Sequence, residues 1–232
     1  MLELFPEGFE ERDLPDGVEL SAYTDGSGEE RLWAAFGQVS AAAVPSGWEE
    51  RWRTFHRPVR VGPLWVGPPW ERPPPGAASV VIDPGRAFGT GGHPTTRLCL
   101  QLLLEVEPTS LLDVGCGSGV LAIAAARLGF APVVAIDTDQ SAIEAADRNA
   151  RDNGATIDVR RGDALADPLP GAGVVIANVS GAFVSDLAPR LLASRLVASG
   201  YLESEQPVVA GYEPIRRMTE GGWAADLLAR DE

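Results

Sequence analysis

The chain has 232 residues, of which 45% are apolar and 22% charged, and its formal net charge is −14. This length can bury one sizeable core with a small appendage, and the composition is ordinary for a soluble globular protein. The sequence has no apolar run long enough to span a membrane and no secretory signal at its acidic N-terminus, so we expect a cytoplasmic protein without membrane contacts.

The first 44 residues consist of short amphipathic pieces. Residues 17–23 alternate like a half-buried strand, and residues 29–36 fit a short helix. Residues 1–50 contain 12 acidic and two basic residues, a balance of −10. Such a field repels nucleic-acid phosphates and attracts cationic partners, although the acidity could equally serve only solubility. We expect a small N-terminal α+β appendage, truncated relative to a full domain, without direct nucleic-acid binding.

Residues 45–78 are rich in proline and tryptophan. They include the run Pro73-Pro74-Pro75 and the tryptophans Trp48, Trp52, Trp65 and Trp70. Prolines stiffen such a segment, and tryptophans need a surface against which to pack. We expect a packed connector between the appendage and a larger domain, rather than a ligand-stacking surface.

From residue 79 to residue 232 short apolar strands alternate with helices. The pattern predicts helices at 120–128 and from the capping box Ser141-Ala142-Ile143-Glu144 to Asn153-Gly154, with an antiparallel edge at 218–230. The expected strands are 110–114, 133–137, 157–160, 174–178 and 195–201. This alternation predicts an α/β fold in which a doubly wound, mostly parallel sheet is covered on both faces.

The sharpest motif is Asp113-Val114-Gly115-Cys116-Gly117-Ser118-Gly119, between the first strong strand and its helix. Its glycines allow unusual backbone angles and close approach of a ligand. A dinucleotide fingerprint would need glycine where Val120 stands, and a P-loop would need lysine, which the chain lacks. The loop resembles the S-adenosylmethionine loop of class I methyltransferases, so Asp113, Gly115, Gly117 and Gly119 are candidate cofactor-binding residues.

Two further acids follow the next strands. Asp137 ends the strand after the glycine loop, where a carboxylate can accept both ribose hydroxyls of an adenosyl ligand. Asp163 follows the third strand, at the place where class I methyltransferases contact the adenine amino group. Either acid alone could merely cap a helix or lie in a solvated loop. Together with the glycine loop, Asp137 favours S-adenosylmethionine as cofactor, while the alternatives for Asp163 stay open.

The segment from Asp83 to Thr96 is richer in glycine and polar residues than a connector requires, although it could be only a capped helix entry. This segment, the glycine loop, Asp137 and Ala177-Asn178 together resemble the ribosomal protein L11 methyltransferase family. The resemblance implies cofactor contacts from Thr96, Gly115, Asp137 and Asn178. It also implies that the N-terminal appendage recognises the substrate protein, and that lysine side-chain amines and the N-terminal α-amine are methylated.

Two features depart from the family pattern. Only about 44 residues precede the connector, so we expect a shortened recognition domain. Asn178 is followed by Val179-Ser180-Gly181-Ala182, where the family usually carries bulkier aliphatic residues. The substrate could therefore be another protein or a small amine. The chain could also be a non-catalytic module that binds S-adenosylmethionine and docks on a partner.

The chemistry of amine methylation directs attention to Asn178 and His93. A protonated amine cannot attack, and the Asn178 side-chain oxygen could orient the neutral amine beside the cofactor, which makes Asn178 the candidate catalytic residue. Alternatively, Asn178 only forms a turn at the end of its strand. His93 is the only histidine near the motifs and could simply bond to its own loop, so we expect the proton to go to water. Cys99 and Cys116 lack metal-ligand spacing, so no metal site is expected.

Overall fold

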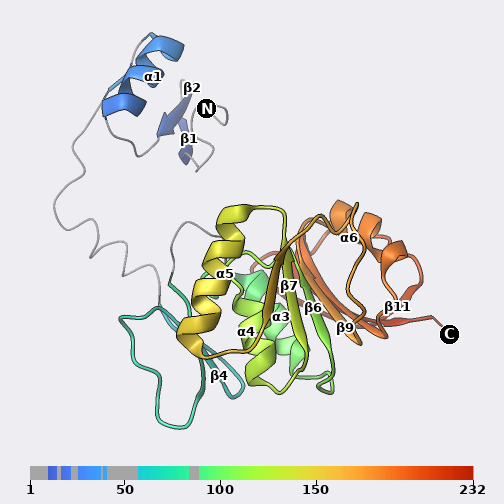
Figure 1. Cartoon of the computed structure of the whole chain (residues 1–232). Coiled ribbons are helices and arrows are strands. Elements are labelled where there is room, and N and C mark those ends of the chain that lie inside the picture. The colour runs from blue at the N-terminus through green and yellow to red at the C-terminus, as the bar shows by residue number, and fades with distance from the viewer. Residues whose placement is uncertain are drawn as a thin grey trace. The chain divides into compact units, whose positions relative to one another are not determined.

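The computed structural model (Figure 1) describes residues 10–14, 17–21, 26–37, 39–40, 57–83 and 89–231. The chain divides into two compact units, Met1–Trp52 and Arg53–Glu232. Trp48 and Trp52 of the expected connector lie outside the described residues, as does part of the segment between Asp83 and Thr96. Within the described ranges, no helix combines the length and the apolarity needed to cross a membrane.

The described residues of the small unit form a two-stranded sheet and one helix. β1 (Glu10–Leu14) pairs antiparallel with β2 (Gly17–Ser21), and α1 (Gly26–Phe36) follows. The strand and the helix expected here are confirmed. β1 was not expected, because four of its five residues are charged and apolar alternation is therefore missing.

The large unit is built on a seven-stranded sheet with the order β11-β12-β10-β9-β6-β7-β8. The five strands from β10 to β8 in this order run parallel, while β12 runs antiparallel to β10 and β11. The strands are β6 (Leu111–Val114), β7 (Val133–Asp137), β8 (Asp158–Arg161), β9 (Val174–Asn178), β10 (Arg195–Leu202), β11 (Tyr212–Glu220) and β12 (Trp223–Arg230). The predicted doubly wound, mostly parallel sheet is confirmed.

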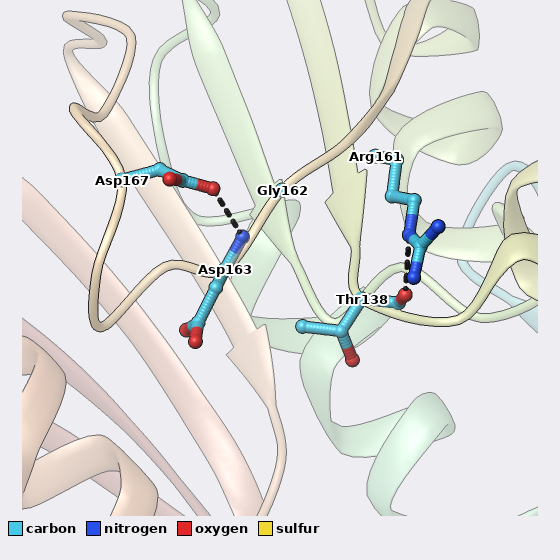
Figure 2. A pocket seen from close by; sticks show the side chains of 5 residues that line it. All are labelled: Thr138, Arg161, Gly162, Asp163 and Asp167. Carbon is cyan, nitrogen blue, oxygen red and sulfur yellow. Dashed lines mark hydrogen bonds between the residues drawn. The ribbon is translucent and has the colours of Figure 1, made fainter.

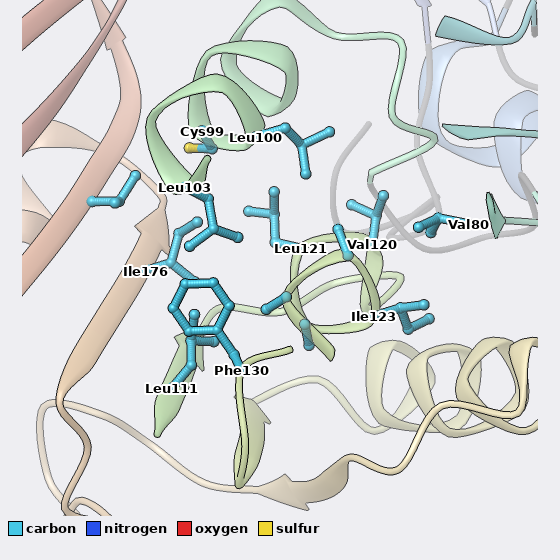
Figure 3. Packing of buried hydrophobic residues seen from close by; sticks show 14 of the residues in the cluster. Val80, Cys99, Leu100, Leu103, Leu111, Val120, Leu121, Ile123, Phe130 and Ile176 are labelled. Atoms are coloured by element: carbon cyan, nitrogen blue, oxygen red, sulfur yellow. The ribbon is translucent and has the colours of Figure 1, made fainter. Parts of the chain in front are cut away.

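Helices cover both faces of this sheet. One apolar core lies under α3 (Pro94–Leu103), α4 (Val120–Arg127) and α5 (Gln140–Asn153), and the other lies under α6 (Gly181–Leu187), on the opposite side in Figure 1. Neighbouring residues of one strand alternate between the cores: Leu111 faces the first and Leu112 the second. In Figure 3, Phe130 and Ile176 lie beside Leu103 of α3 in the first core.

The antiparallel edge expected at 218–230 is confirmed, and it begins earlier, at Tyr212. It is a hairpin of two strands, β11 and β12, and only β11 is the edge strand. The turn falls at Gly221-Gly222, where φ is +58° and +83°. Two glycines can take these angles without the clash that a Cβ would cause, so the chain reverses there.

The start of α5 also differs from the expected capping box at Ser141. The N-cap is Asp139, whose Oδ1 accepts the Ser141 N–H at 2.8 Å and whose Oδ2 accepts the Ser141 hydroxyl at 2.8 Å. These bonds lower the pKa of Asp139, and a carboxylate also suits the positive end of a helix. The helix therefore begins at Gln140, while its end at Gly154, with φ +59°, is as expected.

Residues 57–83 differ from the connector that was expected through residue 78. They form a second sheet, β3-β4-β5, from β3 (Val59–Val61), β4 (Leu64–Gly67) and β5 (Ala78–Val81). Leu64, Val66 and Val80 pack in the same core as α3 and α4. The prolines and tryptophans of this segment suggested a connector, so the strands were not expected. Trp65 is instead a buried residue of β4.

Candidate active site

The order of the strands brings the candidate residues to one edge of the sheet. The chain passes from β6 to β7 on one side and later returns to form β9 on the other side of β6. At such a switch point the loops that follow neighbouring strands diverge and leave a crevice. Asp137 ends β7 and Asn178 ends β9, while Gly115 directly follows β6, so all three lie at the same carboxyl edge.

The glycine loop is a tight turn whose backbone angles favour glycine. Gly115, Gly117 and Gly119 have φ of +71°, +52° and +79°. A Cβ on Gly115 would lie 2.7 Å from Val179 Cγ1, and one on Gly119 would lie 3.0 Å from Ala146 Cβ. The loop thus packs against the chain after β9 and against α5, and its main chain is bare of side chains at these positions.

Asp137 is held in place by the loop that it faces. Its Oδ2 accepts the Gly117 N–H at 3.0 Å, and its Oδ1 accepts the Asp139 N–H at 3.0 Å. An ionised carboxylate has about four lone-pair sites, so each oxygen can accept one further bond. The structure therefore fixes this carboxylate beside the glycine loop and leaves it able to accept two hydroxyl donors.

Asp113 and Thr96 each carry a buried polar atom without a partner among the described residues. Both side chains are about 1% exposed, and the orphaned atoms are Asp113 Oδ1 and Thr96 Oγ1. Asp113 Oδ2 accepts the Ala122 N–H at 3.1 Å, so this carboxylate also anchors the first turn of α4. Burial raises the pKa of Asp113 to about 7. Buried polar atoms almost always have partners, so both atoms fit contact with a polar ligand or a water.

Asn178 lies where the chain leaves β9. Its side chain makes no hydrogen bond to another described residue. The next residue continues the pairing with β10, since the Val179 N–H donates to the Ser199 carbonyl at 2.8 Å. A Cβ on Gly200 would lie 2.0 Å from the Val179 carbonyl oxygen, so the bulge at Gly200, with φ +101°, admits this close passage.

Asp163 lies in a pocket of about 360 Å³ shown in Figure 2, lined by Thr138, Arg161, Gly162, Asp163 and Asp167. The Asp163 N–H donates to Asp167 Oδ2 at 2.8 Å, and Arg161 Nε donates to the Thr138 carbonyl at 3.0 Å. The Gly162 N–H donates to the Asp137 carbonyl at 2.9 Å, which attaches the pocket to the end of β7. Asp163 was expected near the cofactor from the sequence, but Arg161 and Asp167 were not. The one available signal was their position at the end of and after β8, a short exposed strand.

Sequence reasoning also missed two polar residues in the buried stripe of α5. Asn149 and Asn153 occupy this stripe with Ala142, Ala146 and Ala150. Asn149 Nδ2 donates to the Ser118 carbonyl at 2.9 Å, and Asn153 pairs with both backbone groups of Val81. An asparagine in an apolar helix stripe must satisfy its amide inside the protein, so the pattern itself signals such contacts.

His93 is the N-cap of α3. Its Nδ1 lies 2.8 Å from Thr95 Oγ1 and accepts the Thr95 N–H at 3.4 Å. The ring stands edge-on to Trp223, with centroids 5.0 Å apart. Burial, and then the Arg97 charge, lowers the pKa of His93. His93 therefore bonds locally, to Thr95 in the first turn of α3, as one of the two alternatives for this residue proposed. Among the described residues no cluster of acids, cysteines and histidines is suited to hold a metal ion.

A family model described as ribosomal protein L11 methyltransferase (PrmA) matches residues 28–227. The chain belongs to this family. A ribosomal protein L11 methyltransferase from Symbiobacterium thermophilum is 42% identical over 195 residues, which are 80% of this chain and 62% of that protein. One from Pelobacter propionicus is 42% identical over 212 residues, covering 79% of this chain and 66% of its own length.

One solved structure agrees with this assignment. The crystal structure of a ribosomal protein L11 methylase from Lactobacillus delbrueckii subsp. bulgaricus superposes with a TM-score of 0.69 at 29% identity, covering 76% of this chain and all of that one. The expected family and the Rossmann-like class I methyltransferase fold are therefore confirmed. The chain spans 62% and 66% of the length of the two L11 methyltransferases named above.

Proposed function

We propose that this member of the L11 methyltransferase family transfers the methyl group of S-adenosylmethionine to amine nitrogens of a protein. The acceptors are a lysine side chain, the N-terminal α-amine or both, and the protein is a basic protein of the ribosome. The observation that carries this proposal is the carboxyl edge where the bare glycine loop and the Asp137 carboxylate meet.

The residues present fit S-adenosylmethionine. Gly115, Gly117 and Gly119 would let the cofactor lie against the main chain, and the free lone pairs of Asp137 would accept the ribose hydroxyls. The pocket at Asp163 would take the adenine ring. The orphaned atoms of Thr96 and Asp113 support a polar ligand at the start of α3 and α4. When bound, the cofactor supplies a methyl group already activated by its sulfonium.

The protein has to align a neutral amine behind that methyl group. Removing a proton from lysine at neutral pH costs about 4–5 kcal/mol, and removing one from an α-amine costs roughly 1 kcal/mol. Desolvation lowers this cost, and the Asn178 side-chain oxygen, which no described residue engages, would accept a hydrogen bond from the amine and orient it. His93 is engaged in capping α3, which supports proton loss to water.

Charge supports a basic protein as the partner. Residues 1–50 carry a balance of −10, and the family resemblance assigns substrate recognition to the N-terminal region. The same field disfavours direct contact with nucleic acid. A ribosomal protein substrate is consistent with an enzyme that acts in the cytoplasm and does not bind a membrane.

The test is methyl transfer from radiolabelled S-adenosylmethionine to free ribosomal proteins and to purified subunits. We expect one labelled ribosomal protein, with label at lysine or at the N-terminus. Asp137→Asn should weaken cofactor binding by about tenfold or more, because it removes the charge-assisted bonds to ribose. Asp152→Asn, on the exposed face of α5, is the matched control and should bind as the wild type does.

Three results would overturn the proposal in different ways. Label on a non-ribosomal protein or on a small amine would reject the substrate. Calorimetric binding of S-adenosylmethionine without any product would identify a non-catalytic binding module. Equal binding by Asp137→Asn and by the wild type would reject the cofactor site itself.

A further inference from the structure

The segment that leads into α3 is bonded to the glycine loop through a buried serine. The Ser118 hydroxyl donates to the Gly89 carbonyl at 2.5 Å, and Ser118 is only 1% exposed. Because Gly89 precedes the helix that carries Thr96, this bond joins the main chain of the cofactor loop to the main chain before Thr96. The bond is intramolecular and needs no ligand to form.

Asn149 extends this connection. Its Nδ2 donates to the Ser118 carbonyl at 2.9 Å, and its Oδ1 accepts the Asp83 N–H at 3.4 Å. Asn149 is 3% exposed, so these bonds form away from bulk water. One amide on α5 therefore contacts the glycine loop and the chain just beyond β5, and we call the two residues the Ser118–Asn149 pair.

The packing around this pair leaves little room for adjustment. A Cβ on Gly89 would lie 3.0 Å from Ser118 Oγ and 3.6 Å from Val120 Cγ1. A Cβ on Gly91 would lie 2.5 Å from Val66 Cγ1, and both glycines have positive φ. The main chain before α3 thus packs directly on the glycine loop and on β4. The hydrogen bond from Ser118 to Gly89 fixes the distance between that main chain and the glycine loop.

We propose that the Ser118–Asn149 pair is a positioning device that sets the spacing between Thr96 and the glycine loop, and with it the affinity for the cofactor. This inference rests on the proposed function, because it takes S-adenosylmethionine as the ligand of both parts. Neither member of the pair has to touch the cofactor. Ser118 and Asn149 act by holding Thr96, whose buried Oγ1 has no described partner, at one fixed place relative to the loop.

A double-mutant cycle between Ser118→Ala and Thr96→Val tests this coupling. The dissociation constant of S-adenosylmethionine is measured by calorimetry for the wild type, both single variants and the double variant. We expect each single variant to bind about tenfold more weakly. In the double variant we expect Ser118→Ala to add less than about threefold to the effect of Thr96→Val, because the serine acts through the threonine.

A second pair of variants separates positioning from stability. Asn149→Asp keeps the acceptor for Asp83 but loses the donor to the Ser118 carbonyl. Asn153→Asp, one turn further along the same buried stripe, loses the donor to the Val81 and Asn149 carbonyls without touching the glycine loop. We expect both variants to melt at lower temperature, and only Asn149→Asp to weaken cofactor binding by about tenfold.

Multiplicative effects in the cycle would overturn the inference, because Ser118 would then act independently of Thr96. Equal loss of affinity in Asn149→Asp and Asn153→Asp would overturn it too, since the pair would then only stabilise the fold. If the wild type binds S-adenosylmethionine and either result is found, the proposed function stands and this inference fails. If the wild type does not bind, the proposed function fails first.

Discussion

Asp113 is the residue whose environment is least usual in this fold. Its carboxylate lies at the centre of the sheet on β6 and is about 1% exposed. Burial raises its pKa to about 7, the Ala122 N–H partly opposes that change, and the nearby charge of Asp137 adds to it. A charge in this position is expensive, and proteins accept such a cost mainly where a ligand or a function needs it.

The raised pKa of Asp113 predicts how stability changes with pH. The folded chain holds this proton up to about pH 7, whereas the carboxyl group ordinarily releases it near 3.8. The stabilising contribution is therefore complete below that lower value and is lost as the pH rises through about 7. Asp113→Asn cannot ionise, so its advantage in unfolding free energy over the wild type should grow between about pH 5 and about pH 8, by on the order of 1–3 kcal/mol. Urea unfolding at several pH values measures this, and a constant difference would contradict it.

His93 yields a prediction that separates capping from catalysis. An asparagine can accept the Thr95 N–H as an N-cap, whereas alanine cannot. We expect His93→Asn to keep turnover within about tenfold of the wild type, and His93→Ala to lose about 1 kcal/mol of unfolding free energy. Turnover and urea unfolding of both variants measure this. A loss of more than about a hundredfold in turnover in both variants, with cofactor affinity intact, would instead show a direct acid–base role.

At the scale of elements, the site depends on how closely the β6–α4 turn packs on the chain after β9. Gly115 has φ +71°, and a Cβ there would lie 2.7 Å from Val179 Cγ1. Gly154, which ends α5, has φ +59° but nothing within 4 Å of its Cβ position. The two glycines therefore separate the cost of the backbone angle from the cost of crowding.

We expect Gly154→Ala to cost about 1 kcal/mol of unfolding free energy, from the backbone angle alone. Gly115→Ala should cost roughly 2–4 kcal/mol, because crowding adds to the same angle. Adding Val179→Ala to Gly115→Ala should recover part of that loss, since the atom in the way belongs to the Val179 side chain. Chemical denaturation measures all three. No recovery in the double variant would show that the angle, and not Val179, dominates.

Much of the large unit was predictable because its central strands are buried on both faces. β6, β7 and β9 are short apolar runs followed by or ending in a glycine, an aspartate and an asparagine, and the order of the motifs along the chain indicated the switch point. The strands at 59–81 were missed, because prolines and tryptophans obscure alternation and their core partners lie far along the chain. The role of Asn149 was not predictable either, because its partners Ser118 and Asp83 are far from it in sequence.

At the scale of the whole molecule, all the candidate site residues named above belong to the unit Arg53–Glu232. The net negative charge is concentrated elsewhere, with a balance of −10 over residues 1–50 out of −14 for the whole chain. Cofactor binding and substrate recognition therefore belong to different parts of the chain under the proposed function. Charge attraction between exposed groups falls with salt, because the screening length is about 8 Å at physiological ionic strength.

This division predicts the effect of removing residues 1–52. The shortened chain should bind S-adenosylmethionine within about threefold of the full chain, while kcat/KM for the protein substrate falls by at least about tenfold. The difference between the two chains should shrink as salt rises, because the lost contribution is electrostatic. Calorimetry and steady-state kinetics at low and high salt measure this. Equal kcat/KM for both chains would remove the N-terminal region from substrate recognition.

The outer side of β5 has a consequence for behaviour at high concentration. Among the described residues β5 pairs only with β4, and three of its outward backbone groups bond to side chains: the Ser79 carbonyl to Arg127, and the N–H and carbonyl of Val81 to Asn153. The Asn153 amide makes the two hydrogen bonds to Val81 that an adjoining strand would otherwise make. An unprotected strand at that place could recruit the same strand from another copy and begin intermolecular sheets. The Arg127 and Asn153 side chains therefore protect this edge from pairing with another copy. Replacing them should first produce turbidity in concentrated samples.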